Sequence, residues 1–134
     1  MTSIFIVAKN EFITSNLENE GIHLFAHIDN ISSIGEEFSI QRLDECVYTP
    51  TESIAEFLCE AGATEEEISM SNPELWIPAQ TGFQLLNEYI KIVTDYHSLS
   101  EKTKSLILPE LTNFSAILDV LCADGNEWHF EYDI

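Results

Sequence analysis

The last eight residues of the chain carry the pattern that most restricts its fold. Apolar side chains alternate there with polar ones, the apolar set being Trp128, Phe130, Tyr132 and Ile134 and the polar set Glu127, His129, Glu131 and Asp133. Because successive side chains point to opposite sides of a strand, this pattern predicts a strand with an aromatic face and an acidic face. The aromatic face has to be covered, so the fold must pack a second layer on one side of this strand.

Three earlier segments are predicted to be strands of the same sheet. Ser3–Ala8 is a short apolar run rich in β-branched residues, which is typical of a buried strand. In Ile22–Ile28 the aliphatic residues Ile22, Leu24, Ala26 and Ile28 alternate with His23, Phe25 and His27, and a second strand is predicted. Phe38–Tyr48 alternates less regularly and predicts a third.

Two short helices are predicted in the middle of the chain. The segment Thr49–Glu52 combines a capping pattern with a proline at the first helical position, and Gly62 would end that helix. The segment Thr64–Glu67 repeats the pattern. Its glutamates lie in the first helical turn, where the helix dipole favours anions.

Two longer helices are predicted in the second half. Pro78 is placed to open the longest one, which would extend to about His97. It follows a polar loop that carries Trp76. Residues 100–108 are predicted to be a connection, and Pro109 to open the last helix.

These elements predict one α+β domain over residues 1–134. Its small, mostly antiparallel sheet would have about four helices packed on one face. A chain of 134 residues that is 45% apolar is large enough to bury a core of its own. A disordered acidic tail lacks that apolar surface.

The chain is strongly acidic, with 24 Asp and Glu against five Lys and Arg and a formal net charge of −19. The acids are dispersed, and the longest run is Glu65–Glu67. The charge is therefore held at fixed positions on a folded scaffold. Such self-repulsion is tolerated when it serves a purpose, and binding to a strongly basic partner is the leading interpretation. Solubility in a salt-rich environment is the alternative, although the eight Phe argue against it.

The shortage of bases excludes several classes of function. Binding to nucleic acid needs clustered Lys and Arg, whereas the five bases are spread over Lys9, Arg42, Lys91, Lys102 and Lys104. Anionic membrane surfaces would repel the protein. There is also no P-loop, no G-x-G-x-x-G and no G-x-S-x-G motif.

No metal site and no cofactor are expected. His23 and His27 have a helical ligand spacing, but in a strand they would lie roughly 13 Å apart, which is too far for one ion. The cysteines Cys46, Cys59 and Cys122 have no C-x-x-C spacing and are predicted to be reduced, buried thiols.

A cytoplasmic protein is expected. The first residues lack the basic region of a signal peptide, and no apolar run reaches the roughly 18 residues of a membrane span. No catalytic residue is assigned. Because 24 acids guarantee some close carboxylate pairs, a small enzyme or ligand-binding domain stays open as an alternative.

The chain resembles the bacterial immunity proteins that accompany contact-dependent inhibition and type VI secretion toxins. The resemblance lies in size, acidic charge and the absence of catalytic motifs. It includes the segment Glu74–Pro78 leading into a long helix with Gly82, and the helix-then-strand ending Leu111–Ile134. It implies binding to a basic toxin domain, in many cases a nuclease. A DNA mimic that occupies a nucleic-acid-binding protein is an alternative within the binding class.

The resemblance also implies an interface in which carboxylates pair with Arg and Lys around a few aromatic anchors. The candidate carboxylates are Glu36, Glu37, Asp44, Glu45, Glu65, Glu66, Glu67, Glu127, Glu131 and Asp133. Trp76 is the candidate exposed anchor, with a position folded back onto the core as its alternative. Trp128 is expected in the core.

Overall fold

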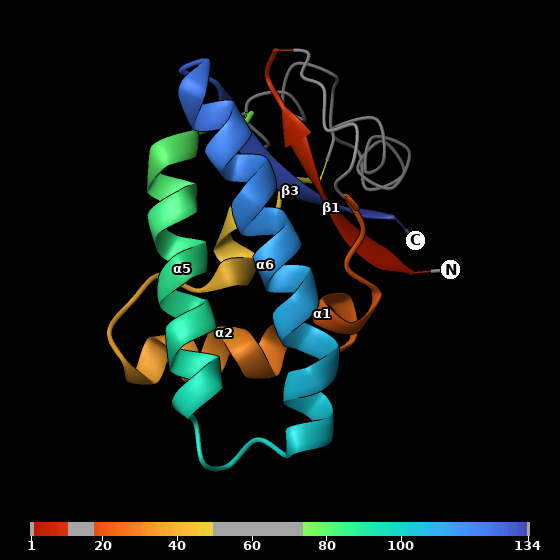
Figure 1. Ribbon diagram of the computed structural model, residues 1–134. Helices are drawn as coiled ribbons and strands as arrows, with labels where there is room; N and C mark the ends of the chain where they lie inside the picture. The colour runs from red at the N-terminus through yellow and green to blue at the C-terminus, as the bar shows by residue number, and fades with distance from the viewer. Residues whose placement is uncertain (1, 11–17, 50–73, 134) are drawn as a thin grey trace, which may run out of the picture.

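Strand β3 (Glu127–Asp133) is the central strand of a three-stranded antiparallel sheet with the order β1-β3-β2. The structure is a computed structural model that describes residues 2–10, 18–49 and 74–133 (Figure 1). On one side β3 pairs with β1 (Ser3–Ala8), and on the other with the two-residue β2 (Ile77–Pro78). Both predicted terminal strands are therefore confirmed, as is the α+β class.

The aromatic side chains of β3 lie in the core. Trp128 and Phe130 are fully buried and meet edge to face, with their ring centroids 4.8 Å apart. Phe130 also contacts Phe114 edge to face at 5.3 Å. The alternating pattern therefore predicted the strand and the burial of its aromatic face.

The outer edge of β1 is occupied by a side chain. Asn19 accepts a hydrogen bond from the main-chain N–H of Ile6 (2.7 Å) and donates one to its carbonyl (2.8 Å). Gly21 exchanges two main-chain hydrogen bonds with Ile4 beside it. These contacts satisfy groups that an open strand edge would offer to another chain.

Helices α5 (Ala79–Asp95) and α6 (Glu101–Ala123) lie side by side over one face of the sheet (Figure 1). α5 begins after Pro78, as predicted. α5 can approach β3 closely because residue 82 is glycine, since a Cβ there would overlap the indole of Trp128. The large side chains that the two helices bury are Leu85, Leu86, Tyr89, Val93, Ile107, Leu111, Phe114, Ile117, Leu118 and Leu121.

The prediction that Pro109 opens the last helix is wrong. α6 begins at Glu101, and the Ser100 side chain caps it by accepting a hydrogen bond from the N–H of Thr103 (3.1 Å). Pro109 lies inside the helix, where it removes one main-chain hydrogen bond. Burial of apolar side chains on both sides of the proline keeps the helix continuous, so residues 100–108 are not a connection.

By length and composition alone, α6 could cross a membrane. No such helix was expected, because no uninterrupted apolar run of the sequence reaches the roughly 18 residues of a membrane span. Seven residues of α6 are buried inside the domain, among them Leu111, Phe114 and Leu118. A core helix of a globular domain passes the same test of length and composition, and α6 packs as one.

The predicted strand at residues 22–28 is also wrong, because these residues are helical. α1 (Ile22–Ala26) is followed at once by α2 (Ile28–Glu37). The two helices place Leu24 and Ile31 in the core. An alternating pattern over so few residues fits two short helices that meet at an angle as well as it fits a strand.

A long-range contact supports the start of α1. The Glu110 carboxylate of α6 accepts hydrogen bonds from the main-chain N–H groups of His23 (3.1 Å) and Leu24 (2.6 Å). Gly21, the residue before the helix, provides no side-chain cap. A carboxylate 87 residues away in the sequence therefore satisfies donors that a neighbouring Ser or Asp usually satisfies.

The predicted strand at 38–48 is likewise absent. Leu43–Cys46 form the short 3₁₀ helix η1, and Val47 makes a single bridge to Phe130. The two helices predicted between residues 50 and 67 lie outside the described residues, as does Cys59.

Candidate partner-binding groove

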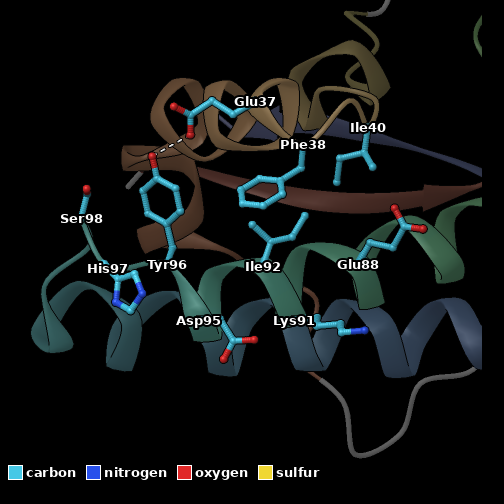
Figure 2. Close-up of a pocket in the computed structure, with 10 residues that line it drawn as sticks. All are labelled: Glu37, Phe38, Ile40, Glu88, Lys91, Ile92, Asp95, Tyr96, His97 and Ser98. Atoms are coloured by element: carbon cyan, nitrogen blue, oxygen red, sulfur yellow. Dashed lines mark hydrogen bonds between the residues drawn. The ribbon is translucent and has the colours of Figure 1, made fainter.

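A groove of about 860 Å³ lies between the end of α2 and the C-terminal half of α5 (Figure 2). Phe38 and Ile40, which follow α2, face Ile92 of α5 across it. Phe38 is 53% exposed, although it is one of the largest apolar side chains of the chain. An exposed aromatic residue in an apolar hollow is typical of a binding surface.

The helical periodicity of α5 explains its wall of the groove. Tyr89 and Val93 point into the core and are fully buried. Glu88, Ile92 and Tyr96 recur at the helical spacing beside them and line the groove instead. One face of α5 therefore packs in the core, and the adjacent face lines the groove.

The turn after α2 holds Phe38 in its exposed position. The N–H groups of Ser39 and Ile40 donate to the carbonyls of Glu36 (3.1 Å) and Gly35 (3.1 Å), which is the Schellman pattern of helix ends. Ser39 has a φ of 61°, in the left-handed region that glycine usually occupies. This costs a serine roughly 1 kcal/mol or more, so the surface feature beside it is held by a strained turn.

Carboxylates stand at both ends of the apolar centre. Glu37 lies at one end, where its Oε2 accepts a hydrogen bond from the Tyr96 hydroxyl (2.6 Å). Glu88 rises beside Ile40 at the other end (Figure 2). The Glu37 carboxylate raises the pKa of Tyr96 through this hydrogen bond, and partial burial of the phenol adds to the effect. The hydroxyl therefore stays protonated and keeps Glu37 in place.

No family model matches the chain, and no curated protein or solved structure does either.

A second acidic group surrounds Arg42 and is already neutralised in part. The Arg42 guanidinium forms ion pairs with Asp29 (2.9 Å), Glu36 (2.8 Å) and Asp44 (2.8 Å). The hydrogen bonds that the guanidinium donates to Asp44 and Glu36 raise the pKa of Arg42 above its usual range. The candidate carboxylates Glu36 and Asp44 therefore tie α2 to η1 through Arg42.

The remaining described candidates are spread over the molecule. Glu45 is exposed on η1, and Asp133 is exposed at the end of β3. Glu127 lies 3.5 Å from the Nζ of Lys9. Of the candidate carboxylates, the structure places Glu37 in the groove, whereas the run Glu65–Glu67 lies outside the described residues.

Glu131 and Trp76 enclose a buried histidine. His129 is 2% exposed, although its side of β3 was expected to face solvent. Its Nδ1 lies 2.6 Å from the carbonyl of Leu75, and its Nε2 lies 2.7 Å from Oε2 of Glu131. The Trp76 ring stacks on the imidazole at 4.4 Å, and its Nε1 donates to Glu74 (2.9 Å). Trp76 is thus half-buried, in the folded-back position that was its alternative.

Of the residues that line the groove, the prediction included Glu37 and missed the others, among them Phe38, Ile92 and Glu88. Phe38 was assigned to a strand face, and Ile92 and Glu88 were given no role. The available signal was an aromatic residue directly after the end of a helix. That signal indicates an exposed aromatic residue only if α2 is known to end at Glu37.

Within the described part of the chain there is no group of three or more His, Cys, Asp or Glu side chains that could hold a metal ion. Burial, together with the neighbouring carboxylates Glu45 and Asp44, raises the pKa of the Cys46 thiol to about 12. A thiol in that state is a poor nucleophile at neutral pH.

Proposed function

We propose that this protein binds and neutralises a basic toxin domain in the cytoplasm, as bacterial immunity proteins do. The observation that carries the proposal is the groove, in which exposed Phe38 stands between Glu37 and Glu88 on a chain of net charge −19. The combination offers a basic protein both attraction at a distance and an apolar contact at close range.

The net charge supports fast capture. A single-signed surface steers an oppositely charged protein and raises its association rate, and salt weakens the effect because the Debye length is only about 8 Å at physiological ionic strength. Among the five bases, Arg42, Lys9 and Lys104 lie within ion-pair distance of this chain's own acids. Few cations are left to repel a basic partner.

The apolar groove supports lasting attachment. Charged rims mainly set association rates, whereas buried anchors in the centre of an interface hold a complex together. Full burial of a phenylalanine side chain contributes about 1.5–3 kcal/mol. Phe38 is half exposed in the free protein, so a partner that covers it gains part of that energy.

Neutralisation would follow from occlusion. A protein that covers the cationic surface of a toxin blocks any substrate that the same surface attracts. The inhibitor needs no catalytic group of its own for this role.

The test pairs this chain with the product of the neighbouring reading frame. That product, expressed alone, should arrest bacterial growth, and coexpression of this chain should restore it. Calorimetry should show a one-to-one complex that binds at least about tenfold more weakly in 500 mM than in 50 mM NaCl. No complex, no rescue, or an affinity that does not depend on salt would contradict the proposal.

A further inference from the structure

We infer that the groove between α2 and α5 receives an apolar side chain from a basic segment of the partner, with a Lys or Arg on each side of that side chain. This inference rests on the proposed function and names the contact that it would use. Its support is the order of groups along the groove: carboxylate, apolar centre, carboxylate.

The apolar centre of the groove is open, and side chains from both walls form it. Phe38, Ile40 and Ile92 point toward one another, and the Phe38 ring lies edge to face with Tyr96 at 6.4 Å (Figure 2). Within the described part of the chain, the exposed large apolar side chains are Phe38 and Val120. Only Phe38 lies in this hollow.

Three carboxylates line the groove, namely Glu37, Glu88 and Asp95, and they define the charge of the occupant. Glu37 and Glu88 are exposed and stand at opposite ends of the apolar centre (Figure 2). The Tyr96 hydroxyl holds Glu37, so this carboxylate is positioned before any partner arrives. A segment with cations on both sides of an apolar residue matches this order, because each cation would meet a carboxylate at the rim.

The negative charge of the protein also disfavours other occupants of the groove. A second copy of this chain would bring another −19 to the same surface, and like charges placed together oppose association. An anionic ligand or an acidic peptide meets the same repulsion. Lys91 is the one Lys or Arg that lines the groove, and it points away from Phe38 along the side of α5 (Figure 2).

The inference is tested with a peptide of defined composition. Isotope-labelled protein is titrated with a seven-residue peptide that has one central leucine between two pairs of lysines. Two comparison peptides replace the leucine by glycine or the lysines by glutamates. We expect amide shifts concentrated on residues 37–40 and 88–97, binding at least fivefold weaker without the leucine, and no binding with glutamates.

Matched variants separate the groove from general charge. Phe38→Ser should weaken binding of the leucine peptide at least fivefold, whereas Val120→Ser, at the other exposed apolar residue, should not. Glu88→Gln should weaken it more than Asp119→Asn, which removes one exposed charge on α6. Lys91→Glu should tighten binding. Circular dichroism of each variant confirms that it is folded.

Three outcomes would overturn the inference. These are amide shifts confined to another surface such as the end of β3, equal binding of the leucine and glycine peptides, and no difference between Phe38→Ser and Val120→Ser. The same variants are then tested on the complex with the toxin. If Phe38→Ser and Glu88→Gln leave the affinity for the toxin unchanged, the groove contact is rejected and the proposed function stands. If no complex with the toxin forms at all, the proposed function itself is rejected.

Discussion

The phenol of Tyr89 fills the space beside Gly35 in which any other residue would place its Cβ. Its hydroxyl also donates a hydrogen bond to the carbonyl of Gln41 (2.6 Å). Tyr89 therefore sets the spacing between α5 and α2 and anchors the chain that follows the groove turn. The groove has its width because residue 35 has no side chain.

Replacement of Gly35 by alanine should lower the free energy of unfolding by about 1–3 kcal/mol, as overpacking of a well-packed core does. The added methyl group has to displace the Tyr89 ring, which has core on all sides. Urea denaturation measures the change. Asn30→Ala, at an exposed position of α2, is the control and should leave stability within about 0.5 kcal/mol of the wild type. Equal stabilities for the two variants would show that Tyr89 moves aside freely.

Ser39→Gly should stabilise the protein by about 1 kcal/mol, because it removes the cost of a left-handed conformation. The hydrogen bonds of the turn are main-chain bonds and stay in place. Ser98→Gly in the loop between α5 and α6 is the matched control and should not stabilise. Thermal denaturation compares the two, and a loss of stability in Ser39→Gly would mean that the serine side chain has a role of its own.

Glu110→Gln should cost about 1–2 kcal/mol, which is the range for loss of a helix cap. The amide keeps one acceptor oxygen but loses the charge that favours a helix N-terminus, and it presents an NH₂ group to the other main-chain N–H. Hydrogen exchange at His23 and Leu24 should accelerate. Asp119→Asn, at an exposed position on the same helix, is the control. Unchanged exchange at both amides would show that the carboxylate is not the cap of α1.

Stability should fall in alkaline solution. Burial raises the pKa of Cys46 from 9.0 to about 12, and burial also raises the pKa of Tyr89. Above pH 9 the unfolded chain releases the Cys46 proton while the folded protein retains it. The free energy of unfolding therefore decreases as the pH rises from 9 toward 12, by at most about 1.4 kcal/mol per pH unit for one group.

Cys46→Ala should make this decline shallower, even if it lowers stability at pH 7 by leaving a small cavity. Urea denaturation at pH 7, 9 and 10.5 measures the slope. Cys122→Ala is the control and should change the slope less, because burial raises the pKa of Cys122 as well but this residue is only half-buried. A slope that Cys46→Ala leaves unchanged would assign the alkaline sensitivity to other groups.

Elements with strong local patterns could be predicted from the sequence. Glu127–Asp133 shows an alternation that fits one secondary structure only, and α5 follows a proline and repeats apolar residues over many turns. Residues 22–28 and 38–48 could not be predicted. Their patterns are short, and their conformation depends on partners such as Glu110 that lie far away along the chain.

The candidate site was predictable only in its charge. Composition indicated an acidic surface, and Glu37 was among the candidate carboxylates. The structure showed that Glu36 and Asp44 pair with Arg42, and that Glu131 contacts buried His129. Whether a carboxylate pairs within the chain or faces a partner depends on which residues fold beside it.

By itself, the sequence determined the net charge of this protein, its terminal strands and the amphipathic helix that follows Pro78, because composition and periodicity are local properties. That helix was predicted to be the longest, whereas α6 is longer. Only the tertiary structure decided that Phe38 stands exposed between Glu37 and Glu88. That arrangement requires a turn after α2 in which the backbone of Ser39 is in the left-handed region. It also requires α2 to lie against α5 through the contact between Gly35 and Tyr89. Contacts between segments that are distant in the sequence create the groove, and local sequence patterns do not predict such contacts.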